Sequence, residues 1–262
     1  MRADGIDPRF VTILVGDNPA SEAYVARKHS DCREMGIASA EIRLPADVTA
    51  SALERVVEDA NSDPSIHGFL VQLPLPPPLD GNQFLSRISP DKDVDGLHPE
   101  NLGRLLRGDP KILPCTPAAI LTLLRHHHVP TAGKKVLIVG RGALVGRPLA
   151  MLMSMKGVDA TVTLAHASTP QLGHLTAEAD IVISAAGVPD LIRSGMVQAG
   201  AAVVGVGISY DSAGAMVSDI ADDVANVARW VTPRHGSVGA LTRAALFENL
   251  LTLASAGNVK RS

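Results

Sequence analysis

The stretch KVLIVGRGALVGRP, residues 135–148, decides the fold. Val136–Val139 is a short run of β-branched and aliphatic residues, which is typical of a buried strand. A glycine-rich turn follows it directly, and from Gly146 the pattern predicts a helix that continues to about Met155. A strand, a glycine-rich turn and a helix in this order indicate a nucleotide-binding unit with a parallel sheet.

The turn contains Gly140, Gly142 and Gly146 in the spacing GxGxxxG. Glycine lets the backbone approach a pyrophosphate, and the N-terminus of the following helix favours its negative charge. The spacing is one residue longer than the NAD-type fingerprint. A tight turn that serves only close packing of helix and strand therefore remains the alternative interpretation.

The strand that follows this unit helps to choose the cofactor. An NAD-binding unit usually carries Asp or Glu there, which binds the ribose hydroxyls. Here Thr161–Leu164 runs into Ala165-His166-Ala167-Ser168-Thr169, without a carboxylate. Arg141 in the glycine turn and Ser168 or Thr169 are suited to a 2′-phosphate, so NADP is the predicted cofactor. An Arg141 that is only solvated remains the alternative.

The rest of the chain alternates strands with helices, which implies a parallel sheet covered on both faces. The other strands are predicted at 11–15, 69–73, 160–164, 179–184 and 201–206, and the other helices at 19–36, 50–61, 117–127 and 242–256. Ser21 either caps the helix at 19–36 or lies in its first turn, and Gly36 ends it.

We expect an α/β protein of two domains with a cleft between them. Residues 1–120 form a catalytic domain, on which a C-terminal helix at 242–262 packs back. Residues 121–241 form a Rossmann-like NAD(P)-binding domain with a parallel sheet.

Composition excludes several classes of protein. The 262 residues are 46% hydrophobic with a net charge of −3, which suits folded domains and not disorder. There is no basic excess and only 3% aromatic residues, so nucleic acid is not an expected partner. No apolar stretch is long enough to span a membrane, and the N-terminus lacks the core of a signal peptide. Cys32 and Cys115 form neither a disulfide framework nor a metal motif. A cytoplasmic protein without a metal is expected.

Three isolated polar residues of the first domain are candidates for chemistry. Tyr24 and Lys28 are four residues apart on a predicted helix and therefore share a face. A desolvated lysine there becomes a usable base or hydrogen-bond donor. Gln72 lies at the exit of a strand, where parallel sheets bind ligands. The alternatives are a surface lysine beside a half-buried tyrosine, and a glutamine that ties down a loop.

Two further clusters are poor metal sites. The segment DKDVDG, residues 91–96, lacks the terminal glutamate of a calcium loop, although one of its aspartates remains suited to an amide-bearing substrate. The run His126–His128 stands at a predicted helix end, and adjacent positions do not share a helix face.

Taken together, the sequence resembles the bifunctional methylenetetrahydrofolate dehydrogenase/methenyltetrahydrofolate cyclohydrolase family. The resemblance covers nearly the whole chain in the family's order. The matching segments are VGDNPASEAYVARKHSDCREMGI (15–37), GFLVQLPLP (68–76), PDKDVDGLHPENLGRL (90–105), PCTP (114–117), GKKVLIVGRGALVGRP (133–148), ADIVISAAGVP (179–189) and TPRHGSVGALTRAALFEN (232–249).

The resemblance implies oxidation of 5,10-methylenetetrahydrofolate with NADP, or with NAD, and then hydrolysis to 10-formyltetrahydrofolate. Lys28 looks like the essential lysine of the hydrolysis, Tyr24 like its partner and Gln72 like the residue that tunes it. Asp95 looks like the carboxylate that holds the pterin. Further implied contacts are Leu73 and Gly239 for the folate, and Gly140, Arg141, Gly142, Gly146, His166, Ser168, Gly207 and Ile208 for the cofactor.

The family resemblance also implies a homodimer that serves purine, methionine and histidine biosynthesis. The chain departs from the family at Gly142, at 165–167, at Gly205 and in the loop 233–242. Family members usually begin about thirty residues earlier, with a helix that is absent from this sequence. Two alternatives therefore stay open. One is a diverged paralogue that keeps the cyclohydrolase with an altered or lost dehydrogenase, and the other is a non-catalytic folate or dinucleotide binder.

Overall fold

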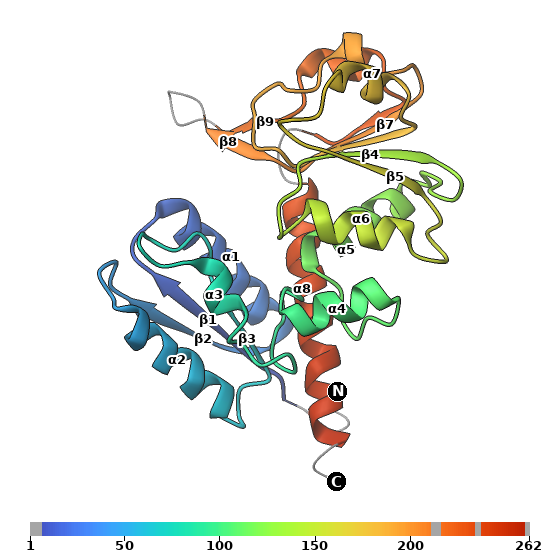
Figure 1. The fold of residues 1–262 in the computed structure, drawn as a ribbon. Helices are drawn as coiled ribbons and strands as arrows, with labels where there is room; N and C mark the ends of the chain where they lie inside the picture. Colours follow the sequence, from blue (N-terminus) through green and yellow to red (C-terminus); the bar gives the residue numbers. More distant parts are fainter. Residues whose placement is uncertain (1–6, 211–215, 234–236, 260–262) are drawn as a thin grey trace. The chain divides into compact units, whose positions relative to one another are not determined.

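The computed structural model describes residues 7–210, 216–233 and 237–259 of the chain. The chain folds into two compact units, each with helices around parallel strands (Figure 1). Unit 1 comprises residues 1–104, 110–115 and 245–262, and unit 2 comprises residues 105–109 and 116–244. The predicted α/β class, with two domains and parallel sheets, is confirmed.

Unit 1 is built on a three-stranded parallel sheet in the order β2–β1–β3. Its strands are β1 (Arg9–Val15), β2 (Ala38–Leu44) and β3 (Gly68–Val71). β1 and β3 follow from their apolar runs and lie where the sequence predicts strands. The sequence did not predict β2, because ASAEIRL contains no apolar run. It forms because its backbone pairs with β1 along all 7 residues, at a sheet edge where its side chains need not be buried.

One face of this sheet packs against α2 (Ala50–Ser62). Leu53 and Val57 of this helix are fully buried and belong to the same apolar cluster as Val11 and Ile13 of β1. Alternate residues of a strand point to one face, so this cluster uses the odd-numbered residues of β1.

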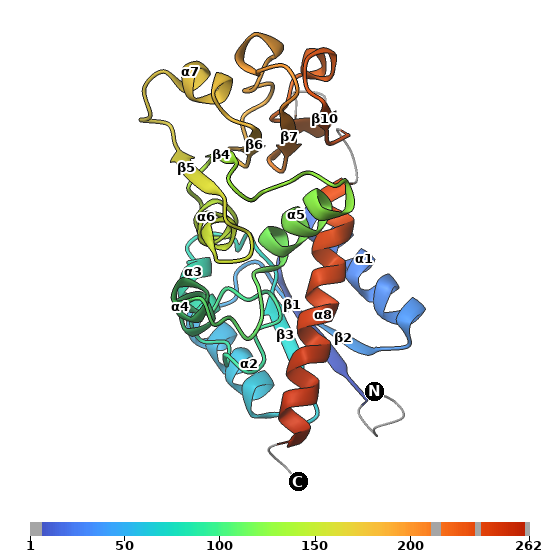
Figure 2. The same cartoon turned by 90° about the vertical axis from the view of Figure 1, so that its right-hand side faces the viewer.

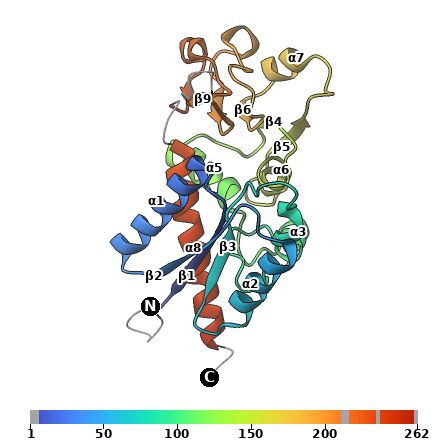
Figure 3. The ribbon, with the colours of Figure 1, turned by 90° about the vertical axis from the view of Figure 1, so that its left-hand side faces the viewer.

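The opposite face of the sheet receives α1 (Pro19–Met35) and the unit 1 part of α8 (Ser237–Val259). Figure 3 shows α1 and α2 on opposite sides of the sheet. Phe10 of β1 contacts Phe247 of α8 edge to face, with ring centroids 6.0 Å apart. A Cβ at Gly68 would overlap the side chain of Val94 and lie 3.0 Å from that of Leu250 in α8, so glycine leaves room for both.

Both ends of α1 are capped. The side chain of Asn18 accepts hydrogen bonds from the backbone N–H groups of Ala20 and Ser21. Ser21 therefore lies in the first turn and is not the cap. Gly36 ends the helix in the left-handed conformation, at φ 67°.

His29 fastens α1 to the sheet. Its ring joins Thr12 of β1 (Nε2 to Oγ1, 2.8 Å) and Ser39 of β2 (Nδ1 to Oγ, 2.9 Å). Burial lowers the pKa of His29, as do the charges of Arg33 and Lys28, while Glu41 acts in the opposite direction.

Unit 2 contains a five-stranded parallel sheet in the order β10–β7–β6–β4–β5. Its strands are β4 (Lys135–Val139), β5 (Thr161–Ala165), β6 (Ile181–Ser184), β7 (Ala202–Gly205) and β10 (Trp230–Val231). Figure 2 shows α6 (Gly146–Ser154) and α7 (Leu172–Ala177) on opposite sides of it. Leu137 and Val139 face the α7 side and are buried there.

The remaining elements are short. They are α3 (Gly81–Leu85), α4 (Pro99–Arg107), α5 (Cys115–His126), the 3-10 helices Ser194–Met196 and Asp222–Asn226, and the antiparallel pair β8 (Ile208–Tyr210) and β9 (Met216–Ser218). Within the described ranges, no helix is long and apolar enough to cross a membrane.

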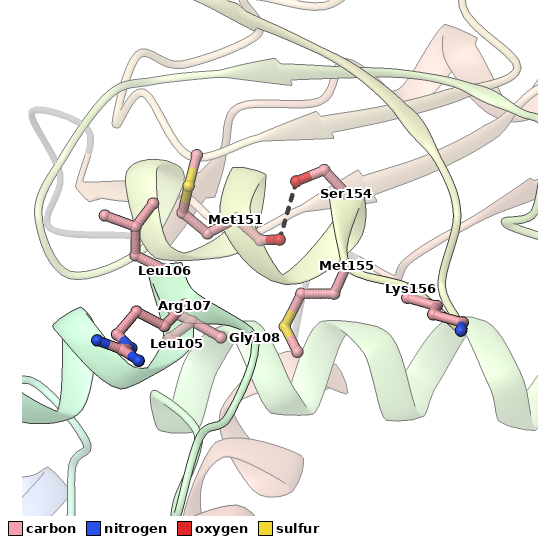
Figure 4. Close-up of a pocket in the computed structure, with 8 residues that line it drawn as sticks. All are labelled: Leu105, Leu106, Arg107, Gly108, Met151, Ser154, Met155 and Lys156. Atoms are coloured by element: carbon pink, nitrogen blue, oxygen red, sulfur yellow. Dashed lines mark hydrogen bonds between the residues drawn. The ribbon is translucent and has the colours of Figure 1, made fainter.

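The end of α4 and the last turn of α6 border a shallow hollow of about 230 Å³ in unit 2. Figure 4 shows Leu106 and Met151 at its edge, both of them exposed, and the hydrogen bond from Ser154 Oγ to the carbonyl oxygen of Met151. Its lining carries positive charge from Arg107 and Lys156 and no carboxylate, and it shares no residue with the candidate sites described below.

We expect the hydrogen bonds of the His29 ring to Thr12 and Ser39 to stabilise the protein less in acid. Because the pKa of His29 in the folded protein lies below its ordinary value of about 6.5, the unfolded chain binds this proton more readily. The contribution of His29 to stability is therefore complete above pH 6.5 and is lost as the pH falls toward the folded-state pKa. Urea unfolding of the parent and His29→Gln should show a stability difference that shrinks from pH 7.5 to pH 5. A difference that is constant or grows in acid would contradict this role.

Candidate active site

Lys28 is the buried lysine at the centre of the candidate site in unit 1. α1 carries it to the end of β3, where the residue is only 4% exposed. Its Nζ donates a hydrogen bond of 3.1 Å to Oε1 of Gln72. The same Nζ lies 4.7 Å from the ring centroid of Tyr24, one helical turn earlier. A surface lysine, the alternative interpretation of the sequence, is ruled out.

Gln72 is held at both ends. Its backbone N–H donates to the carbonyl of Ile13 (2.8 Å), which extends the pairing of β3 with β1. Its side-chain Nε2 donates to the carbonyl oxygen of Leu73 (2.7 Å). This bond fixes the amide so that Oε1 is turned to Lys28. Gln72 therefore ties down the chain after β3 and also holds the lysine, and Leu73 contributes its backbone to this arrangement.

Asp95 is the carboxylate near this lysine. Burial raises the pKa of Asp95, while the charge of Lys28 works in the opposite direction. Its backbone carbonyl accepts a hydrogen bond of 3.1 Å from the backbone N–H of Cys115, and the Cys115 thiol interacts with its carboxylate. Burial next to this carboxylate raises the pKa of Cys115 well above its ordinary value, so the thiol stays protonated.

The other two aspartates of DKDVDG have structural tasks. Asp93 is buried and accepts hydrogen bonds from the backbone N–H groups of Gly96 and His98 and from Nδ2 of Asn101. Asp91 is exposed and forms an ion pair with Lys111. The three carboxylates therefore serve three separate purposes, and Asp95 is the one beside Lys28.

Asn249 on α8 supports the Asp95 loop and was not singled out by sequence. Its Nδ2 donates to the carbonyl oxygens of Val94 (2.9 Å) and Leu113 (2.8 Å). Gly96 makes this approach possible, since it has φ 71° and a Cβ there would lie 2.8 Å from the Leu113 backbone. An asparagine among the apolar residues of the predicted C-terminal helix was the available signal, because such a group needs partners when it is buried.

The glycine turn in unit 2 joins β4 to α6, as predicted. Gly140 has φ 117°, and a Cβ at Gly146 would overlap the carbonyl oxygen of Gly140. These two glycines are therefore required by packing. A Cβ at Gly142 would meet nothing within 4 Å, so open space lies beside this part of the turn. Arg141 is exposed next to it.

The segment after β5 is a tight turn that contains no carboxylate. The backbone N–H of His166 donates to Oγ1 of Thr169 (2.9 Å), and the backbone N–H of Ser168 donates to Nδ1 of His166 (3.2 Å). A proton on the His166 ring is therefore held at Nε2, and the Ser168 side chain is exposed.

A buried aspartate organises the loop after β6, and it too was missed by sequence. Asp219 accepts hydrogen bonds from the Ser184 hydroxyl and from the backbone N–H groups of Ala186, Gly187 and Val188. Gly207 is needed here because a Cβ would overlap the Asp219 carboxylate.

Two predicted site residues need a separate comment. Ile208 lies at the start of β8, and its side chain is outside the described residues. Gly239 lies in the first turn of α8, where its carbonyl oxygen accepts a hydrogen bond from Arg243 and a Cβ would meet nothing within 4 Å. Residues 234–236 of the altered loop 233–242 are also outside the described residues.

The glycine turn allows a matched pair of substitutions. Gly146→Ala forces a methyl group into the Gly140 carbonyl and should destabilise the protein by about 1–3 kcal/mol. Gly142→Ala has room and should leave the melting temperature unchanged, but its methyl group would occupy the space offered to a pyrophosphate. Calorimetric titration with NADP should show about tenfold weaker binding by Gly142→Ala. Unchanged NADP affinity in that variant would show that the turn serves packing alone.

The chain matches known families over most of its length. Residues 1–95 match the catalytic domain of tetrahydrofolate dehydrogenase/cyclohydrolase, and residues 114–258 match the NAD(P)-binding domain of the same family.

Solved structures agree with this assignment. The bifunctional enzyme FolD methylenetetrahydrofolate dehydrogenase/cyclohydrolase from Campylobacter jejuni is 40% identical, with a TM-score of 0.91 over 97% of this chain and 90% of that chain. The enzyme from Trypanosoma brucei, solved with NADP cofactor and inhibitor, is 40% identical, with a TM-score of 0.90 over 97% and 89%. The bifunctional enzyme from Thermoplasma acidophilum is 30% identical, with a TM-score of 0.92 over 98% and 92%. The chain therefore belongs to the tetrahydrofolate dehydrogenase/cyclohydrolase family of enzymes and carries both of its domains.

Proposed function

We propose that this chain oxidises 5,10-methylenetetrahydrofolate with NADP and then hydrolyses the methenyl product to 10-formyltetrahydrofolate, with Lys28 as the catalytic residue of the hydrolysis. The observation that carries the residue assignment is the cluster in unit 1. A buried lysine is hydrogen-bonded to a fixed glutamine, lies against a tyrosine ring, and has a carboxylate nearby.

The residues of unit 2 fit a dinucleotide with a 2′-phosphate. Open space beside Gly142 accommodates a pyrophosphate, and the N-terminus of α6 favours its charge. The turn after β5 offers Ser168 and His166 and no carboxylate that would repel a phosphate. The Trypanosoma brucei relative was solved with NADP, which supports the same cofactor here.

In the first reaction, bound NADP supplies the acceptor for a hydride that leaves the bridging methylene carbon of the folate. The product is the methenyl cation. For this step the chain provides positioning. Asp219 fixes the 184–188 loop, and close packing fixes the glycine turn, so that the proposed cofactor site in unit 2 is rigid. The carboxylate of Asp95 lies near Lys28 and stabilises the ammonium that forms whenever this lysine takes up a proton.

In the second reaction, water adds to the cationic carbon. The neutral amine of Lys28 accepts a proton from that water, which leaves a hydroxyl group on the carbon and an ammonium at Lys28. The C–N bond of the ring then breaks: the ammonium returns its proton to the leaving ring nitrogen, the hydroxyl proton goes to solvent, and the formyl group remains on the other nitrogen. The Gln72 carbonyl oxygen holds Nζ in one direction, and the ring of Tyr24 covers another side of it. These two contacts limit where the lone pair of the amine can point.

Asp95 suits the pterin ring, which presents an amide N–H next to an exocyclic amine. A carboxylate binds such a pair through two parallel hydrogen bonds. Cys115 and Asn249 keep the loop of Asp95 in place, so they are positioning residues.

The setting of the enzyme is also a proposal. A homodimer and roles in purine, methionine and histidine biosynthesis rest on the family resemblance alone. A cytoplasmic location is supported by the two cysteines, Cys32 and Cys115, which are free and buried, as is usual in a reducing compartment.

One observation favours a diverged dehydrogenase as the second candidate. Where the family carries an aspartate, this chain has Gly205, and a Cβ there would lie 2.8 Å from Oγ of Ser218 and 2.9 Å from Ile220. The side chains around Gly205 therefore leave little room for any larger residue at this position. Gly205 is the last residue of β7 in unit 2. A difference there therefore affects the nucleotide-binding unit and leaves the Lys28 cluster of unit 1 intact.

Two assay arms on the purified protein separate the candidates. One arm supplies 5,10-methylenetetrahydrofolate with NADP, and in parallel with NAD, and follows the reduced cofactor. The other supplies methenyltetrahydrofolate alone and follows its loss above the spontaneous rate. Activity in both arms is expected. Activity in the second arm alone would indicate the diverged paralogue, and binding without turnover in either arm would indicate a non-catalytic binder.

Lys28→Met should lower hydrolysis of methenyltetrahydrofolate by about 10²–10⁴-fold, because it removes the proton acceptor and keeps the volume of the side chain. Hydride transfer should remain measurable, since Lys28 has no part in accepting the hydride. Lys156 is an exposed lysine, so Lys156→Met is the control and should change the rate in neither assay arm. Hydrolysis by Lys28→Met at the parent rate would refute the assigned role.

The raised pKa of Asp95 sets an acid limit on folate binding. Because the ionised carboxylate is the form that accepts from the pterin, the KM for the folate should rise as the pH falls through a pKa above that of an ordinary aspartate. Asp95→Asn should raise KM by about 10–100-fold at neutral pH and abolish this acid limb. The pH profile of kcat/KM in the dehydrogenase arm measures both effects. A limb that persists in Asp95→Asn would belong to another group.

A further inference from the structure

A second hollow of about 400 Å³ lies at the amino ends of the strands of the unit 2 sheet. Its lining includes Ile181, Ala202 and Trp230, at the first positions of β6, β7 and β10. The glycine turn follows the opposite, carboxyl end of β4 (Lys135–Val139). This hollow is therefore separate from the dinucleotide turn, and its volume is in the range of small-molecule sites.

The wall of the hollow is aromatic. The ring of Trp230 is half-buried and packs on the ring of His127, with centroids 4.7 Å apart and planes inclined by 42°. His127 in turn contacts His126 edge to face at 5.0 Å. Packing by His127 holds the indole in place, so it offers a flat surface on which a planar ring stacks.

Positive charge dominates the rim. Arg229 is exposed, and within the described ranges its guanidinium has no ion pair. Lys134 forms a 3.5 Å ion pair with Asp180, the one carboxylate of the lining. Asp180 is also engaged by the backbone N–H of Lys135 (2.9 Å). The rim thus has two cations and a single, already occupied carboxylate, which favours an anionic ligand.

The backbone at the edge of the hollow is strained. α5 ends in a Schellman motif, in which the N–H of Val129 bonds to the carbonyl of Leu124 and the N–H of His128 bonds to the carbonyl of Arg125. The left-handed position of this motif normally holds glycine, but here it holds His128 at φ 54°. A non-glycine residue there costs about 1 kcal/mol or more. The cost is explained if the His128 side chain, which lines the hollow, has a use there.

We propose that this hollow is a binding site for a nucleoside monophosphate, distinct from the dinucleotide site. The base stacks on Trp230, and the phosphate is bound by Arg229, Lys134 and His128. The ligand needs an aromatic ring, because the wall of the hollow offers a stacking surface. It also needs an anionic group, because the rim carries more positive than negative charge.

The chain offers its own reporter for this site, since Trp230 is its single tryptophan. The parent protein is first saturated with NADP, so that the dinucleotide site is filled. It is then titrated with 5′-AMP while Trp230 emission is followed, with adenosine and inorganic phosphate titrated separately. A saturable change with AMP, and at least tenfold weaker responses to either fragment, is expected.

Variants test the residues. Arg229→Gln should weaken AMP binding by about tenfold through loss of a charge-assisted contact. His128→Gly should also weaken it, yet leave the melting temperature equal or higher, because glycine relieves the strained position. Arg193→Gln, an exposed arginine of the same unit outside the hollow, is the matched control and should bind like the parent.

The proposal is overturned if AMP causes no saturable change in Trp230 emission. It is also overturned if NADP saturation abolishes a change seen without NADP, since AMP would then be binding at the dinucleotide site. It is also overturned if Arg229→Gln and His128→Gly, both shown folded by thermal melting, bind AMP with the same affinity as the parent and the Arg193→Gln control.

Discussion

Unit 1 depends on the burial of the Lys28 amine, which is charged whenever it holds a proton. An ammonium group removed from water costs several kcal/mol unless hydrogen bonds and opposite charge replace the lost hydration. The Lys28–Gln72 hydrogen bond, the ring of Tyr24 and the charge of Asp95 provide that replacement. Gln72 is fixed by a backbone hydrogen bond to β1, and the loop of Asp95 is fixed by Asn249 of α8. The candidate site and the packing of unit 1 are therefore one set of interactions.

This coupling explains why residues outside the site matter to it. His29 fastens α1 next to Lys28, so that the helix cannot rotate without breaking bonds to two strands. Asn249 holds the carbonyl groups around Asp95 from a helix more than 130 residues later in the chain. Neither residue touches the proposed reaction. Both limit the movement of groups whose geometry catalysis requires.

Unit 2 depends on a constraint of volume. The carbonyl oxygen of Gly140 occupies the place where any side chain at position 146 would project, and Gly207 leaves room in the same way for the carboxylate of Asp219. Because these contacts are backbone to backbone, or backbone to a buried carboxylate, neighbouring side chains cannot relieve them. At Gly142 the opposite holds, since the space beside it is open. Within the motif, Gly140 and Gly146 are therefore required by packing, whereas Gly142 leaves open space beside the turn.

Sequence alone determined the elements whose signal is local. Apolar runs such as 136–139 predict buried strands, glycine after a strand predicts the turn, and the spacing of Tyr24 and Lys28 puts them on one helix face. The long matching segments identified the family, which the domain matches confirm. Short or edge elements gave no such signal. β2 has an alternating, half-exposed pattern, and β10 has only two residues, so both form through pairing with strands distant in sequence.

The tertiary structure decided which polar residues meet. Among Asp91, Asp93 and Asp95, the family resemblance singled out Asp95, but the spacing of the three gave no reason for the choice. Packing supplies it, because one carboxylate forms an ion pair, one accepts loop hydrogen bonds and one lies near Lys28. The roles of Asn249 and Asp219 were likewise decided by contacts with residues far away in the sequence. The physical reason is that periodicity and propensity report the local backbone. Burial of a charge or an amide is satisfied only by partners that the fold brings from elsewhere.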